Sequence, residues 1–217
     1  MRIHALLFLL FTQSAFALYG GKAVAPQRYL VELSVSGQSF CQGTVIAPNK
    51  VLTTGHCIQG MGLRLKDTSL LLTYYPEVVT ITQGAQKVRA KRIDLAPSYF
   101  DSPGLEAEDL ALIELEAPLK SAVVLPVASK NEIVPGSKLL LASLKEEAET
   151  SFRKKLSGPD STIIMTDGSH AGVCQGDSGG TLVLEKNGKK FIAGILSAQA
   201  EGCARRHSIS YFPRTKF

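Results

Sequence analysis

The sequence lacks the features that mark several large classes of protein. Its 217 residues contain no run of five or more Lys or Arg, and the formal net charge is only +5. A nucleic-acid-binding surface is therefore not indicated. No long polar tract, internal repeat or low-complexity segment is present, and 45% of the residues are hydrophobic. A chain of this kind is expected to bury a sizeable core rather than to stay disordered.

Cysteine is also scarce, and its spacing excludes a common metal site. There are four cysteines, and no two of them form a CxxC pair, so a zinc site is poorly supported. No acidic loop indicates a calcium site, and we expect no metal and no cofactor. Beyond the first residues, no stretch is apolar enough to span a membrane.

The start of the chain has the pattern of a secretory signal peptide. Arg2 and His4 precede an apolar run at 5–11, which is too short to cross a bilayer, and small residues stand at Ala15 and Ala17. A buried N-terminal helix is the less favoured interpretation. We therefore expect residues 1–17 to be removed on export, which makes Leu18 the first residue of a secreted or periplasmic protein.

In an exported protein, the cysteines are expected to form disulfides. An even number of cysteines in an exported chain favours disulfides. Four cysteines allow two disulfides with three possible pairings; they are Cys41, Cys57, Cys174 and Cys203.

Short apolar stretches bounded by Gly, Pro, Asn or charged residues recur along the chain and predict many short strands. The pattern favours an all-β barrel or sandwich. Asn187-Gly188 predicts a hairpin turn. The best helical candidate is the charged segment 145–155, and a break is expected near 118–121. The predicted strands are 29–35, 43–47, 51–54, 70–74, 110–115, 138–142, 162–166, 181–184 and 191–196.

One segment, "GVCQGDSGGTLVL" at 172–184, places Ser178 among glycines. A serine hydroxyl needs a base and an orienting carboxylate to act as a nucleophile. Histidine suits the role of base because imidazole titrates near neutral pH. His56 in "VLTTGHCIQG" and Asp109 in "EDLALIEL" are the candidates. Taken singly, each of these signals is weak, because such residues are usually structural.

Together, "TTGHC", "DLALIEL" and "GDSGG" resemble the trypsin-like (chymotrypsin-fold) serine peptidases, in that family's order of His, Asp and Ser. The resemblance covers essentially all of the chain after residue 17. It implies two six-stranded antiparallel β-barrels, at about 18–118 and 119–217, with the active site between them. Only six residues follow Tyr211, so the family's C-terminal helix is expected to be missing.

The resemblance assigns a role to each motif residue. His56 matches the general base, Asp109 its orienting carboxylate and Ser178 the nucleophile. The backbone N–H groups of Gly176 and Ser178 match the oxyanion hole, where two amides must point at one oxygen. The implied disulfides are Cys41–Cys57 and Cys174–Cys203.

The resemblance also implies a means of activation. In the family, the residue matching Asp177 pairs with the freed N-terminal ammonium, which would here belong to Leu18. A buried carboxylate without its cation is costly, so we expect the oxyanion loop to be misplaced until residues 1–17 are removed. Leu18 and Tyr19 replace the family's usual β-branched pair.

Substrate choice is read from the positions that match the family's specificity pocket. Gly172 stands where trypsin has an aspartate, so a basic P1 residue is disfavoured. Ser197 and Gln199 would form the wall, and Gln199 would narrow the pocket; Ser210 is a further candidate. The pattern predicts small or medium uncharged P1 residues.

The sequence thus predicts a secreted serine endopeptidase that acts on proteins or peptides as a monomer. It is expected to bind neither nucleic acid nor, after signal cleavage, a membrane. One alternative is an inactive peptidase homologue that acts as a binding protein, although all three triad residues are present. A lipase-type hydrolase is disfavoured because its chain order is Ser, Asp, His.

Overall fold

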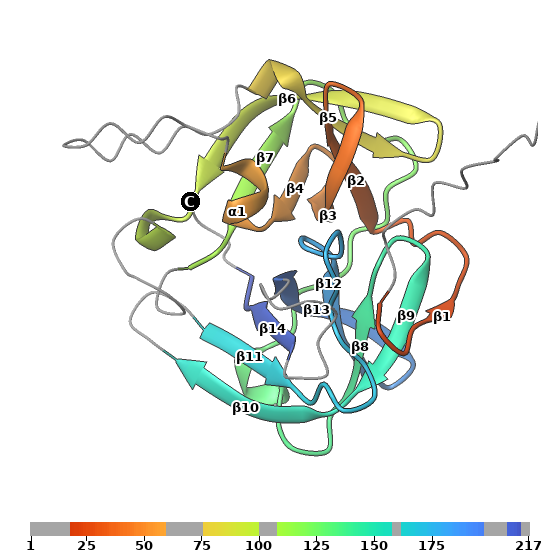
Figure 1. Ribbon diagram of the computed structural model, residues 1–217, viewed down its shortest axis with the longest axis vertical. Coiled ribbons are helices and arrows are strands. Elements are labelled where there is room, and N and C mark those ends of the chain that lie inside the picture. The colour runs from red at the N-terminus through yellow and green to blue at the C-terminus, as the bar shows by residue number, and fades with distance from the viewer. Residues whose placement is uncertain (1–17, 60–75, 100–107, 158–161, 198–207, 214–217) are drawn as a thin grey trace, which may run out of the picture.

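The structure is a computed structural model, and it describes residues 18–59, 76–99, 108–157, 162–197 and 208–213. Within this part of the chain, the fold is almost entirely β (Figure 1). The helical segments are single turns, and none is long and apolar enough to cross a membrane. They are α1 (Gly55–Ile58), η1 (Pro76–Val78), η2 (Pro97–Tyr99) and η4 (Lys130–Glu132).

The first half forms a closed six-stranded barrel, in the order β2-β3-β4-β7-β6-β5. Neighbouring strands are antiparallel, and pairing of Leu33 with Ile81 between β2 and β5 closes the ring. Alternate residues point inward, as in β7, where Ala111, Ile113 and Leu115 are buried. The strands are β2 (Leu30–Val35), β3 (Gln38–Ala47), β4 (Lys50–Thr53), β5 (Val79–Gln83), β6 (Gln86–Leu95) and β7 (Ala111–Leu115).

The second half forms an eight-stranded sheet, in the order β1-β9-β8-β12-β13-β14-β11-β10, which is not closed by a ladder in the described residues. β9, which lies next to the edge strand β1, is nevertheless followed directly in the chain by β10, which forms the opposite edge, because Ser151 alone separates these two strands. The amide of Asp167 donates to the Ser151 carbonyl at this bend. The strands are β1 (Lys22–Ala23), β8 (Lys138–Ala142), β9 (Glu146–Thr150), β10 (Phe152–Ser157), β11 (Thr162–Thr166), β12 (Thr181–Lys186), β13 (Lys189–Ser197) and β14 (Ser208–Tyr211).

The helix predicted at 145–155 is wrong, because the segment forms β9 and β10. Its many charged residues are common in helices, but β9 pairs with β8, and β10 pairs with β11. Tertiary pairing here overrides local preference. The Asn187-Gly188 hairpin is confirmed: both residues have positive φ, and Lys186 pairs with Lys189 across the turn. The predicted strand at 70–74 and the end of the chain after Pro213 lie outside the described residues.

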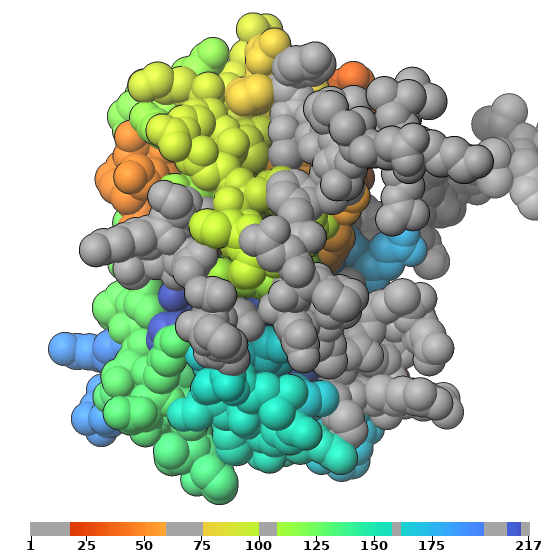
Figure 2. Space-filling view, turned by 90° about the vertical axis from the view of Figure 1, so that its left-hand side faces the viewer, coloured from red at the N-terminus to blue at the C-terminus, as the bar shows by residue number. Residues whose placement is uncertain are grey.

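The two halves of the molecule share part of their hydrophobic core. Figure 2 shows the yellow atoms of the barrel strands above the teal and cyan atoms of β10 and β11. Leu52 and Leu110 from the barrel side pack in one buried cluster with Ile163, Ile195 and Ile209 from the sheet. The expected division at 118/119 is crossed by β1, which precedes the barrel in sequence but pairs with β9 in the second sheet.

Candidate active site

His56 is carried by α1, at the edge of the barrel. The disulfide between Cys41 and Cys57 ties this turn to β3. Both cysteines are buried, whereas His56 stays exposed over 41% of its side chain. The turn is thus fixed by its neighbours, and the imidazole is left open to a ligand.

Asp109 holds the imidazole from behind, just before β7. Its Oδ2 lies 2.8 Å from His56 Nδ1, and its Oδ1 accepts the His56 backbone N–H at 2.9 Å. The Ser197 hydroxyl also donates to Oδ2, at 2.8 Å. Burial by itself raises the pKa of the Asp109 carboxyl, but the hydrogen bonds and charge of His56, together with the Ser197 hydroxyl, outweigh it and lower the pKa below its ordinary value. The carboxylate therefore stays ionised and favours a proton on Nδ1.

Ser178 completes a chain of three side chains. Its Oγ lies 3.0 Å from His56 Nε2, on the opposite side of the ring from Asp109. Ser178 lies in the loop before β12, so the site joins the barrel to the second sheet. Gly176 in the same loop has φ of +95°, a conformation that side chains disfavour. The sequence therefore supplies glycine where the loop must turn its amides.

Gly179 explains a further glycine of the motif. Its φ is +86°, and a Cβ on it would lie 1.8 Å from the Gln42 carbonyl oxygen and 2.5 Å from Thr53 Oγ1. The Ser178 loop thus passes in direct contact with the backbone of β3 and with the Thr53 side chain of β4. The Gln42 backbone N–H also donates to the Ser178 carbonyl oxygen at 2.8 Å. This close approach fixes the nucleophile loop against the barrel.

The expected specificity residues are only partly described. Gly172 exchanges two backbone hydrogen bonds with Tyr19, so its amide and its carbonyl are both engaged. Ser197 turns its hydroxyl to Asp109, and Gln199 lies outside the described residues. The buried Ser208 hydroxyl accepts the Val173 amide at 3.1 Å. Ser210 is fully buried.

Leu18 and Asp177 are not brought into direct contact. The Leu18 nitrogen donates to Glu146 Oε2 at 2.7 Å, and the Leu18 side chain is buried. The Asp177 carboxylate accepts instead from the Cys174 amide at 2.9 Å and lies 3.4 Å from Gln42 Nε2. Burial first, and then the nearby Glu146 charge, raise the pKa of Asp177 to about 6, against hydrogen bonds from Cys174, Ser143 and Gln42.

The second disulfide that the resemblance implies is Cys174–Cys203. Cys174 is disulfide-bonded, whereas its expected partner Cys203 lies outside the described residues.

In the described part of the chain, the side chains of Cys41, His56 and Cys57 are close enough together to suggest a metal site. Both sulfur atoms belong to a disulfide, so they offer no thiolate to a metal ion.

Sequence reasoning missed several residues around the site. Gln42 and Glu146 carry no motif, and only the fold brings them to Asp177 and Leu18. Ser197 was placed in the substrate pocket, without its bond to Asp109. No local signal in the sequence marks these three contacts, because each joins residues far apart in the chain.

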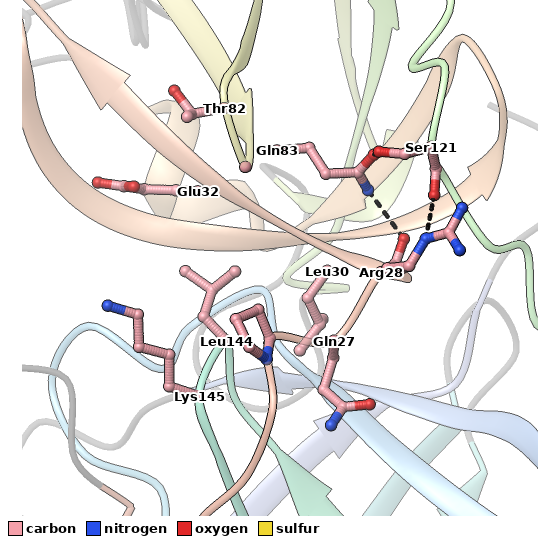
Figure 3. A pocket seen from close by; sticks show the side chains of 11 residues that line it. Gln27, Arg28, Leu30, Glu32, Thr82, Gln83, Ser121, Leu144 and Lys145 are labelled. Carbon is pink, nitrogen blue, oxygen red and sulfur yellow. Dashed lines mark hydrogen bonds between the residues drawn. The ribbon is translucent and has the colours of Figure 1, made fainter.

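A cavity of about 430 Å³ lies between the barrel and the turn after β8 (Figure 3). Glu32, Thr82 and Gln83 line it from the barrel side, opposite Leu144 and Lys145. None of the three triad residues lines it.

Comparison with known proteins finds a matching family and a relative of similar sequence. A family model described as "Trypsin" matches residues 19–216. Granzyme M of Homo sapiens is 27% identical over an alignment length of 213, and the match covers 85% of this chain and 79% of granzyme M.

Proposed function

Because this chain belongs to the trypsin family of serine peptidases, we propose that it is an active, exported serine endopeptidase. The observation that carries the proposal is the continuous chain of contacts from Ser178 Oγ to His56 Nε2, and from His56 Nδ1 to Asp109 Oδ2. A nucleophile, a base and an orienting carboxylate stand in the order and at the distances that acyl transfer needs.

The proposed reaction proceeds in two halves. Ser178 Oγ attacks the carbonyl carbon of the scissile bond while His56 Nε2 takes the hydroxyl proton and then gives it to the leaving amine. Water, deprotonated by the same nitrogen, then attacks the acyl carbonyl carbon, and His56 Nε2 returns the proton to Ser178 Oγ as the acid product leaves. Asp109 holds the Nδ1 proton and stabilises the imidazolium in both halves.

The backbone N–H groups of Gly176 and Ser178 are assigned as the donors that stabilise the developing oxyanion. Loss of one such donor typically costs about 3 kcal/mol of transition-state stabilisation. The positive φ of Gly176 supports this assignment, because it lets a loop that carries two convergent amides turn without strain.

The proposed substrates are proteins or peptides with a small or medium uncharged P1 residue. Gly172 offers no charge to a basic side chain. Family membership and the Cys41–Cys57 disulfide support an extracellular or periplasmic location. Removal of residues 1–17 and a monomeric state complete the proposal.

The test is intact-mass measurement after a fluorophosphonate reagent is added to the exported protein, with Ser178→Ala as the control. One adduct on the wild-type protein, absent from the control, is expected, and cleavage of peptides that vary at P1 then gives the specificity. A folded wild-type protein without an adduct would instead favour an inactive homologue that acts by binding.

A further inference from the structure

Gly55 is the first residue of α1, directly before His56, and its own backbone does not explain why it is glycine. It lies in the helical turn and is not among the described residues with positive φ. In that conformation alanine is a better helix former than glycine. Glycine at this position therefore indicates that a neighbouring group occupies the space of a side chain.

The neighbouring group is the ring of Tyr99, at the end of η2. A Cβ on Gly55 would lie 2.5 Å from Tyr99 Cε2, 2.6 Å from Cδ2 and 3.2 Å from Cζ, and these are the three nearest atoms beyond its chain neighbours. Carbon atoms in good contact are about 3.5–4 Å apart, so this Cβ and the ring cannot both be accommodated as they stand. The half-buried ring thus packs on the backbone of the turn that carries His56.

The Tyr99 hydroxyl holds the other end of the same turn. It donates to Gln59 Oε1 at 2.7 Å, and the backbone N–H of Gln59, the C-cap of α1, donates to the Gly55 carbonyl at 3.0 Å. Burial first, and then the Asp109 charge, raise the pKa of Tyr99 to about 12, so the hydroxyl remains a neutral donor. One side chain therefore contacts both ends of the turn.

Tyr99 is itself attached to the segment that carries Asp109. The Tyr99 backbone N–H donates to the Ala96 carbonyl at 3.0 Å, and the N–H of the buried Ala96 donates to the Leu110 carbonyl at 2.9 Å. Leu110 follows Asp109 directly and is fully buried. A chain of contacts thus runs from the Asp109 segment through η2 to both ends of α1, in addition to the direct hydrogen bonds between Asp109 and His56.

We propose that Tyr99 is a positioning residue for catalysis, whose ring and hydroxyl hold the turn that carries His56. Gly55 is glycine because the Tyr99 ring occupies the space of a side chain. The effect on catalysis rests on the proposed function, whereas the contact between the ring and the turn does not. A misplacement of a reacting group by about 1 Å can cost about 100-fold in rate, so a side chain that acts only through this turn can limit the reaction.

The test of the ring is a cycle of single and double variants, Gly55→Ala and Tyr99→Ala, in the exported protein. Gly55→Ala adds the Cβ that meets the ring, and Tyr99→Ala removes the ring. The readouts are kcat, KM, the rate constant of fluorophosphonate labelling, and hydrogen exchange of peptides that cover 54–59.

Gly55→Ala alone is expected to lower kcat and the labelling rate by about 10-fold, because the turn and the ring must move apart. KM should change by less than about threefold, and exchange at 54–59 should accelerate. In the Tyr99→Ala background, the same substitution should lower kcat by less than about twofold, since the ring is gone. Equal losses of kcat from Gly55→Ala in the two backgrounds would overturn the proposal.

The test of the hydroxyl compares Tyr99→Phe with Tyr29→Phe. Tyr29 is the matched control because it is a buried tyrosine whose hydroxyl donates to Glu147 Oε1, at 3.1 Å. Tyr99→Phe keeps the ring and loses the bond to Gln59, so kcat is expected to fall by about two- to fivefold, with faster exchange at 54–59. Tyr29→Phe should keep the wild-type kcat and the wild-type exchange of this segment.

Failure of this proposal and failure of the proposed function give different results. Wild-type exchange at 54–59 in both Tyr99→Phe and Tyr99→Ala would overturn the positioning role, whatever the activity. A wild-type protein that is not labelled by fluorophosphonate, but in which Gly55→Ala accelerates exchange only while the Tyr99 ring is present, would remove the peptidase function and leave the hold of Tyr99 on the turn standing.

Discussion

At the residue scale, Asp177 makes the stability of this protein depend on pH in an unusual direction. A carboxyl in a folded protein commonly has a lowered pKa, but Asp177 has a pKa of about 6 against an ordinary value of 3.8. Burial is the main cause, and the nearby Glu146 charge adds to it. The folded state therefore holds a proton that the unfolded chain has already released between these two pH values.

We expect Asp177 to contribute stability that is fully present below about pH 4 and is lost as the pH rises to about 6. The shift corresponds to about 3 kcal/mol. Because other groups titrate over the same range, the measurement is the difference in unfolding free energy between wild type and Asp177→Asn, from urea titrations at pH 4, 5, 6 and 7. The variant should gain on the wild type as the pH rises. A difference that does not vary with pH would contradict this.

The residues that the sequence could identify are those set in motifs. His56, Asp109 and Ser178 each stand in a local pattern, and their order along the chain strengthens the assignment of all three. Gln42 stands in a strand with no such pattern, and its side chain contacts Ser143, Leu144 and Gly176, which are more than a hundred residues away in the chain. Contacts of this kind depend on the packing of two separate sheets, which no local pattern records.

At the element scale, the turn into β12 is more restrictive than the turn out of it. Gly179 and Gly188 both have positive φ, at +86° and +70°. A Cβ on Gly179 would overlap the backbone of β3, whereas a Cβ on Gly188 would meet nothing within 4 Å. The two positions share the same backbone penalty but differ in the space around them.

Gly188→Ala is therefore expected to lower the unfolding free energy by about 1 kcal/mol, the cost of the left-handed conformation alone. Gly179→Ala should lower it by more than about 4 kcal/mol or prevent folding, because β3 must also move. Urea denaturation followed by circular dichroism measures both. Equal losses in the two variants would show that the loop can move away from the barrel.

Many of the strands with continuous apolar residues were predictable, whereas the strongly charged strands and two short uncharged ones, β5 and β14, were not. The predicted 138–142 and 162–166 coincide with β8 and β11. β6 was missed because its outward face is made of Lys and Arg, with only Val88 and Ala90 buried near its middle. β9 and β10 were taken for a helix for the same reason: their apolar content is low, and pairing within the sheet decides their structure.

At the scale of the whole molecule, the two halves are expected to unfold together. Leu52 and Leu110 pack with Ile195 and Ile209 of the other half, and Tyr29 and Leu30 pack with Val183. Hydrogen bonds cross the same boundary, as between Thr44 and Thr181. Neither half can lose its packing without exposing part of the core of the other.

Leu52→Ala should lower the urea midpoint of peptides from the barrel and from the sheet by the same amount, since it costs about 2–5 kcal/mol in a shared cluster. Hydrogen exchange in urea reports both halves in one sample. Leu33→Ala, in the cluster internal to the barrel, is the comparison and should shift both midpoints as well. Two separate midpoints in either variant would show that the halves unfold independently.

In the export that we propose for this protein, the pairing of β1 with β9 sets an order of events during translocation. A chain that crosses a membrane N-terminus first presents Leu18 and β1 to the far side early, while Glu146 and Glu147, which hold them, are still behind. The earliest segment to emerge is thus the last to find its place. Under this proposal, the interval keeps the bond after Ala17 within reach of a signal peptidase, and it ends when the residues that pack on Leu18, such as Leu182 and Leu196, arrive.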